Sequence, residues 1–133
     1  MSIKKSIVIT GCILLGVFIV LFTTITLLRT LSDGMCGNEV IKKEISPDGL
    51  YIAYAFLRNC GATTSFSPQV TIMKNGKELK NEGGNIFIGN RSEYIDIKWE
   101  DSKTLIIYHT VNANNIHKQE DEIYGIRIKY NTK

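Results

Sequence analysis

An uninterrupted apolar run from Ile7 to Leu28, without a single charged residue, constrains this chain most strongly. As an α-helix rising 1.5 Å per residue, its 22 residues span roughly 33 Å, enough to cross the hydrocarbon core of a bilayer. Lys4 and Lys5 precede the run, whereas Arg29 and Asp33 follow it. Because cytoplasmic flanks of membrane helices carry an excess of basic residues, we expect the N-terminus in the cytoplasm and the remainder outside it.

The run divides the chain into four predicted parts. These are a cytoplasmic N-terminus over residues 1–6, a transmembrane helix over 7–28, a linker over 29–37 and an exported β domain over 38–133. The expected location is therefore the cell membrane, crossed once, with the C-terminal domain extracytoplasmic. The lipid bilayer is the first expected partner.

Two other interpretations of the N-terminus remain open. A cleaved secretory signal has an apolar core of about 7–15 residues and a small-x-small cleavage site, and this run is longer. The tetrapeptide from Ile9 to Cys12 resembles the lipobox of bacterial lipoproteins, in which the cysteine becomes lipidated. The segment between Lys5 and Ile9 is too short for a lipoprotein signal core, and the apolar run continues past Cys12. We therefore expect an uncleaved anchor.

The charge of the expected exported part is nearly balanced. From Arg29 onward the chain holds 14 Lys and Arg residues and 13 Asp and Glu residues. A nucleic-acid-binding protein needs a basic patch or stripe, and Lys42-Lys43 is followed directly by Glu44. We therefore expect no nucleic-acid partner, and an unidentified protein partner instead.

Cys36 and Cys60 form an even pair outside the apolar run, and a disulfide is the expected state of such a pair in an exported domain. Two free thiols and a Cys–His metal site are the alternatives. A metal site is disfavoured because no Cys-x-x-Cys pair is present and His109 and His117 lie far along the chain. We expect no metal and no cofactor.

The remaining segments are short, β-branched or aromatic, and bounded by turn residues. Leu50–Leu57 is apolar on both faces, which predicts a central strand, and Tyr94–Trp99 alternates with Trp99 inward. Asn75-Gly76 predicts a tight hairpin turn. The sequence therefore predicts a transmembrane helix followed by an all-β antiparallel meander of about six or seven strands, folded as a small barrel-like or sandwich domain.

Two resemblances accompany this pattern. Ile45–Tyr54 resembles the strand–turn–strand unit of Tol-type β-propellers, but the chain holds one copy, so no propeller is expected. Ser46–Gly49, Asn59–Thr64, Gln69–Ile72 and Ile97–Trp99 are together similar to a group of small bacterial anchored or lipidated proteins. Those proteins carry an SPDG turn and a Cys-Gly-Ala-Thr-Thr segment in this order. The resemblance implies an anchor, a β domain and an exported location, and supplies no activity.

Small and hydroxyl side chains cluster directly after Cys60, and this cluster is the candidate binding site. Its backbone amides and hydroxyls suit a peptide end or an anion, whereas the alternative is a tight loop beside the disulfide. The candidate binding residues are Gly61, Ala62, Thr63 and Thr64. We expect partner contact to centre here, with the loop Asn112–Asp121 as the second choice.

No catalytic constellation emerges from the sequence. His109 and His117 have no spaced acid–base partner, and both are expected to be exposed to solvent. We therefore expect a protein that is not an enzyme, namely a membrane-tethered extracytoplasmic binding or accessory domain that acts by protein–protein contact. An inhibitor or immunity-type protein is the more specific alternative, and a small exported hydrolase is the rival class.

Overall fold

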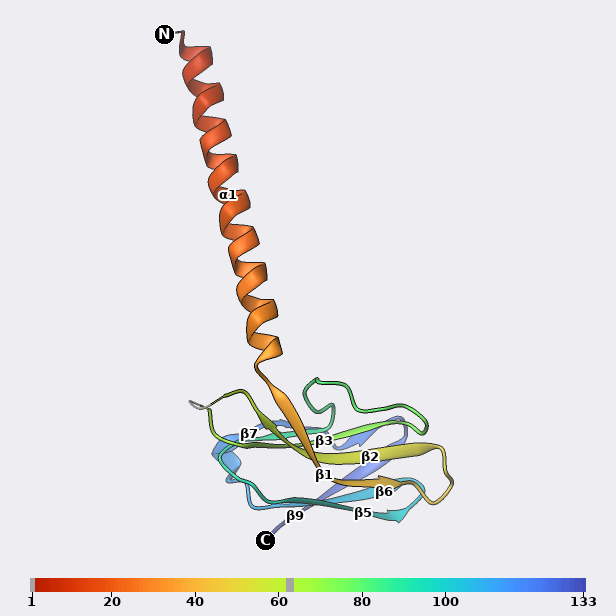
Figure 1. The fold of residues 1–133 in the computed structure, drawn as a ribbon. Coiled ribbons are helices and arrows are strands. Elements are labelled where there is room, and N and C mark those ends of the chain that lie inside the picture. The colour runs from red at the N-terminus through yellow and green to blue at the C-terminus, as the bar shows by residue number, and fades with distance from the viewer. Residues whose placement is uncertain (1, 62–63) are drawn as a thin grey trace. The chain divides into compact units, whose positions relative to one another are not determined.

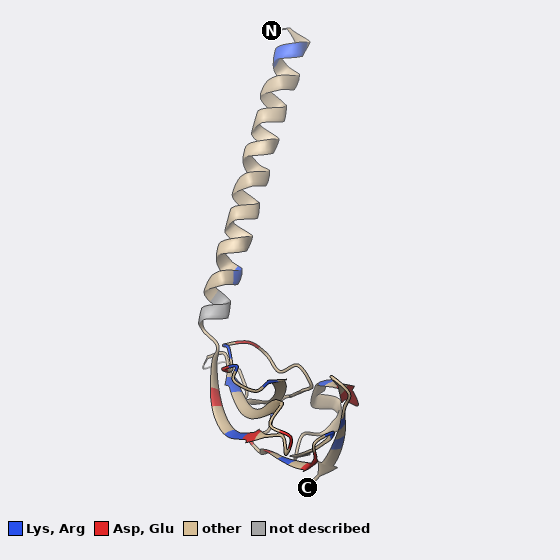
Figure 2. Ribbon diagram, turned by 90° about the vertical axis from the view of Figure 1, so that its right-hand side faces the viewer, with Lys and Arg blue, Asp and Glu red and all other residues tan. Residues whose placement is uncertain are grey.

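The computed structural model describes residues 2–61 and 64–133, apart from the side chains of residues 32–34. Its first element is α1 (Ile3–Gly34), a helix of 32 residues. The part Ile3–Leu31 is long and apolar enough to cross a membrane. Figure 2 shows basic residues near both ends of this helix and none along its middle. The helix is longer than the predicted transmembrane segment and takes in most of the segment predicted as a linker.

Hydroxyl groups within α1 are bonded to the helix itself. Thr24 donates to the carbonyl of Val20 at 2.7 Å, and Thr30 donates to that of Leu27 at 2.8 Å. Such bonds to the preceding turn satisfy a hydroxyl where lipid offers no partner. The threonines of the run are therefore compatible with an apolar environment.

The rest of the chain is a β domain of two sheets, which spans Cys36–Lys133. The first sheet has the strand order β1-β2-β3-β4-β7, and the second has the order β5-β6-β9-β8. Figure 1 shows the two sheets as stacked layers. A short 3-10 helix, η1 (Ala113–Asn115), precedes β7. The strands are β1 (Gly37–Ile45), β2 (Tyr51–Asn59), β3 (Ser67–Lys74), β4 (Phe87–Gly89), β5 (Ile95–Asp101), β6 (Thr104–His109), β7 (Ile116–Gln119), β8 (Glu122–Ile123) and β9 (Ile126–Thr132).

The predicted helix followed by a β domain is confirmed, and over the described residues the domain has two sheets and is not closed as a barrel. Its described residues form nine strands, more than the six or seven predicted. One pair also departs from the antiparallel meander, because β6 and β9 run parallel. Between them the chain crosses to the first sheet, where β7 pairs with β4, and returns to the second sheet in β8 and then β9. This crossover accounts for the parallel direction.

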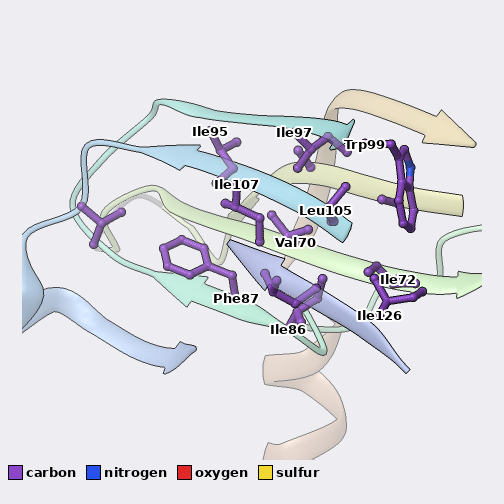
Figure 3. Packing of buried hydrophobic residues seen from close by; sticks show 14 of the residues in the cluster. Val70, Ile72, Ile86, Phe87, Ile95, Ile97, Trp99, Leu105, Ile107 and Ile126 are labelled. Atoms are coloured by element: carbon purple, nitrogen blue, oxygen red, sulfur yellow. The ribbon is translucent and has the colours of Figure 1, made fainter. Parts of the chain in front are cut away.

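The core lies between the two sheets, where side chains from both layers point toward one another (Figure 3). Trp99 is 8% exposed and belongs to this cluster, as predicted, and its indole Nε1–H donates to the carbonyl of Glu44 at 3.1 Å. Strand β2 is buried on both faces, which confirms its central position. The core residues that are completely buried include Ala53, Ala55, Val70, Ile72, Ile86, Phe87, Ile97, Leu105 and Ile107.

The Asn75-Gly76 turn does not close a two-residue hairpin. Gly76 has the positive φ that such a turn requires, but the next strand paired with β3 begins only at Phe87. The intervening residues 75–86, called the strap below, pass over the outer face of the first sheet, where Leu79 packs against a small second core. This core consists of Ile52, Tyr54 and Phe56, with Met73 beside it. The turn therefore opens a loop that covers the sheet.

Candidate functional site

The disulfide ties together the open ends of the first hairpin. Cys36 and Cys60 are bonded to each other, as the sequence predicted. Gly37, the first residue of β1, lies opposite Asn59, the last residue of β2, so the bridge continues the ladder of the two strands. The residues after Cys60 therefore leave the sheet from a covalently fixed point.

Hydrogen bonds hold the described ends of the loop after Cys60. The Thr64 hydroxyl donates to the carbonyl of Gly61 at 2.9 Å and accepts from the backbone N–H of Cys60 at 3.3 Å. Asn59 Oδ1 accepts from the N–H of Gly61 at 3.0 Å. Gly61 has a φ of 115°, which glycine adopts without a steric penalty. Thr64 is therefore tied to Cys60 and Gly61, and its one hydroxyl proton is used in these bonds.

Of the four residues predicted to bind a partner, the structure brings Gly61 and Thr64 into contact. Ala62 and Thr63 lie outside the described residues. The candidate site must therefore be built on the surface that adjoins Thr64.

That surface is a groove of about 730 Å³, called the Cys60 groove below. Polar side chains dominate its walls, and Phe66, 39% exposed, is the largest apolar group in it. Ser92 Oγ and Thr110 Oγ1 lie 2.7 Å apart in a hydrogen bond between its walls. A hydroxyl-rich hollow of this kind suits a ligand that both donates and accepts hydrogen bonds. The lining residues are Thr64, Ser65, Phe66, Arg91, Ser92, Glu93, Tyr94 and Thr110.

Arg91 supplies the guanidinium of the Cys60 groove. Its φ of 57° is uncommon for a residue with a side chain, and hydrogen bonds maintain it. The Arg91 N–H donates to the carbonyl of Phe66 at 3.0 Å and to Asn90 Oδ1 at 2.9 Å. Asn90 Oδ1 also accepts from the Ser65 hydroxyl at 3.0 Å, so one amide oxygen connects the two segments. The Arg91 side chain is exposed and makes no ion pair within the described part of the chain.

The C-terminal end of the chain reaches the same groove. Lys133 Nζ donates to the Tyr94 hydroxyl at 2.8 Å and lies 4.8 Å from the centre of the Tyr94 ring. The hydrogen bond with Tyr94 raises the pKa of the Lys133 amine. The lining of the groove therefore holds the guanidinium of Arg91 and the carboxylate of Glu93, and the Lys133 amine adjoins it through Tyr94.

Sequence reasoning found one wall of the groove and missed the other. Thr64 came from the cluster after Cys60, whereas Arg91, Tyr94 and Thr110 lie far along the chain in segments without a motif. Only the sheet pairing brings them together.

The prediction that His109 is exposed is wrong. Its side chain is 3% exposed and stacks on Phe87, with ring centres 4.8 Å apart. Its Nδ1 accepts from the backbone N–H of Val111 at 3.2 Å. Burial lowers the pKa of the His109 imidazole, because the charged form loses its hydration. The imidazole is a core residue, whereas His117 is exposed as predicted.

The titratable side chains do not assemble into a metal centre. Over residues 2–61 and 64–133, no group of three His, Cys, Asp or Glu side chains is placed to hold an ion. A cluster of three charged side chains joins two strands instead. Lys42 Nζ bonds to Asp96 at 2.9 Å and lies 3.0 Å from Glu44, which links β1 to β5. The hydrogen bond that Lys42 donates to Asp96 raises the pKa of the Lys42 amine.

An apolar N-terminal helix followed by a disulfide-bonded, two-sheet β domain defines the class of protein. The site on that domain is a polar groove beside a braced loop. Residues 3–128 match a family of unknown function, DUF5412, and the chain belongs to this family. No curated protein and no solved structure matches the chain.

Proposed function

We propose that this protein is a membrane-tethered binding or accessory domain, with its N-terminus in the cytoplasm and its β domain outside it. The domain acts by contact with another protein, and the Cys60 groove is the contact surface. The observation that carries the proposal is a polar groove whose walls are fixed before a partner arrives.

Preorganisation supports the choice of this surface. The disulfide fixes Cys60, Thr64 braces the loop that follows, and Asn90 connects Ser65 with Arg91. Binding to surfaces that are already ordered costs less conformational entropy than binding to flexible ones. An unpaired guanidinium beside hydroxyl groups then offers directional hydrogen bonds to a partner's carboxylate or carbonyl groups.

Location is supported by two separate features. Lys4 and Lys5 precede the apolar helix, which favours a cytoplasmic N-terminus. The Cys36–Cys60 disulfide suits an oxidising compartment, where such bonds persist. A reporter enzyme that is active only after export, fused behind Lys133, tests this orientation. Activity is expected, whereas activity of a reporter that works only in the cytoplasm would reverse the proposed topology.

Site-specific photocrosslinking in intact cells tests the surface. A benzophenone amino acid replaces Phe66 in the Cys60 groove, and the control replaces Tyr124, which is 61% exposed but lies outside the groove. We expect one defined protein adduct from position 66, weakened by Arg91→Gln, and none from position 124. Adducts from position 124 alone contradict the site. Zinc copurifying with a protein that yields no adducts favours the rival hydrolase.

A further inference from the structure

The strap forms a second groove, of about 680 Å³, between itself and β3. Both ends of the strap are held to the sheet. Asn38 Nδ2 donates to the carbonyls of Lys80 and Glu82 at 3.1 and 2.8 Å, and the Tyr54 hydroxyl reaches the carbonyl of Lys77 at 3.4 Å. This strap groove shares no lining residue with the Cys60 groove. It is therefore a separate and preformed hollow on the domain.

The side chain of Thr71, a nearly buried residue, lies in the wall of the strap groove without a hydrogen-bond partner among the described residues. Thr71 is 5% exposed, and within the described residues its side chain makes no hydrogen bond. No polar side-chain atom there is both fully sealed from solvent and unpaired, so the Thr71 hydroxyl opens into the groove that Thr71 lines. A nearly buried hydroxyl is costly to leave without a hydrogen bond. A ligand in the groove would supply that bond.

Aliphatic groups flank this hydroxyl, and charges of both signs surround it. Met73 and Leu79 line the groove and rest on the second core below it. The rim carries Lys77 and Lys80 against Glu78 and Glu82, so its formal charges cancel. The groove therefore combines an apolar floor that holds one hydroxyl with a charged rim whose formal charges cancel.

These properties discriminate between ligand classes. Phosphate groups need a net positive site, and the two carboxylates of the rim oppose them. An acyl chain offers nothing to the Thr71 hydroxyl, which would lose its water without a replacement. A sugar carries hydroxyl groups on most of its surface, whereas the floor of the groove beside Met73 and Leu79 offers a single hydroxyl. An aliphatic side chain next to an amide suits both the hydroxyl and the apolar surface. The amide forms a hydrogen bond with the Thr71 hydroxyl, and the flexible side chain of Met73 adapts to varied aliphatic shapes.

We infer that the strap groove binds a neutral aliphatic side chain of a polypeptide, with an adjacent backbone amide hydrogen-bonded to Thr71. Met73 and Leu79 contact the side chain. Because the rim has no net charge, the groove does not discriminate between positive and negative residues next to that side chain in the peptide. The inference does not depend on the Cys60 groove.

Methyl NMR of the full chain in lipid nanodiscs tests this inference, with N-acetyl-leucinamide as the probe. The probe has one aliphatic side chain and amides on both sides. For a ligand of its size we expect a dissociation constant on the order of millimolar. Saturable shifts are expected at the methyl groups of Thr71, Met73 and Leu79. No saturation at these methyls overturns the inference and leaves the Cys60 proposal standing.

Two matched variants isolate the hydroxyl. Thr71→Val keeps the shape and removes the oxygen, so affinity should fall about fivefold, the effect of one hydrogen bond. Thr104→Val is the control, because Thr104 is 7% exposed, its side chain makes no hydrogen bond among the described residues, and it lines neither groove. Affinity should be unchanged there. Equal affinity in wild type and Thr71→Val contradicts the inference, as does stronger binding of octanoate or glucose than of the amide.

Discussion

Removal of the Cys36–Cys60 disulfide should lower the stability of the β domain by several kcal/mol. The substitution is Cys60→Ser, which keeps the size of the side chain and leaves the backbone N–H that bonds to Thr64. Its main effect is therefore on the covalent link. In the folded variant Gly37 can still pair with Asn59.

The magnitude follows from the loop that the bridge closes. The two cysteines are 24 residues apart, and in the chain-entropy model such a loop restricts the unfolded chain by about 3.5 kcal/mol. Small domains are stable by only about 5–15 kcal/mol, so this is a large share. For a urea dependence of about 1.5 kcal/mol per molar, the midpoint should fall by roughly 2 M.

The single tryptophan of the chain provides the assay. Trp99 is buried between the sheets, so its fluorescence follows unfolding of the β domain in urea while α1 stays in a nanodisc. A reducing agent should shift wild type to the midpoint of Cys60→Ser and leave that variant unchanged. Cys12→Ser is the control, because Cys12 is a free cysteine in α1. A midpoint loss below about 0.5 M, or an equal loss in Cys12→Ser, refutes the reasoning.

Three further perturbations test the core and the strap. Trp99→Ala should cost about 3–5 kcal/mol in urea unfolding followed by circular dichroism, and a water-exposed emission maximum in the folded wild type would contradict its burial. Gly84→Ala should cost about 1–3 kcal/mol, because an added Cβ would lie 2.7 Å from the carbonyl oxygens of Phe87 and Val70; an unchanged midpoint contradicts that close approach. Since the folded pKa of His109 is lowered from 6.5, wild type should be fully stable above pH 6.5 and lose stability as the pH falls below it. His109→Gln should lose this dependence between pH 5 and 7, and an equal slope in both proteins contradicts it.

Local pattern was sufficient where one segment decides its own structure. The apolar run predicted α1, and the two apolar faces of Leu50–Leu57 predicted the central position of β2. Trp99 was correctly predicted to face the core, because the other face of its strand carries polar residues. The cysteine pair was correctly joined because only two cysteines lie outside the helix.

Local pattern failed where both faces of a strand are apolar or where distant segments meet. In β6, Leu105 and Ile107 face the core with His109, but Ile106 and Tyr108 are equally suitable by composition. The alternation could therefore not assign the histidine to a face. The Cys60 groove and the parallel pairing of β6 with β9 depend on strand order, which hydrophobic alternation within a single strand does not encode.

The position of the disulfide also determines how this domain would respond to mechanical tension. If the domain is tethered as proposed, a pull from the membrane would enter it at Cys36, and the bond to Cys60 would bypass residues 37–59 while the bridge is intact. These residues form the first hairpin, which supplies the edge strand β1 and its neighbour β2 to the larger sheet. Reduction would place the hairpin in the load path and, once it unravelled, add about 80 Å of extended chain. In that arrangement the bridge would keep tension off the first hairpin, and the extension on reduction is measurable by single-molecule pulling.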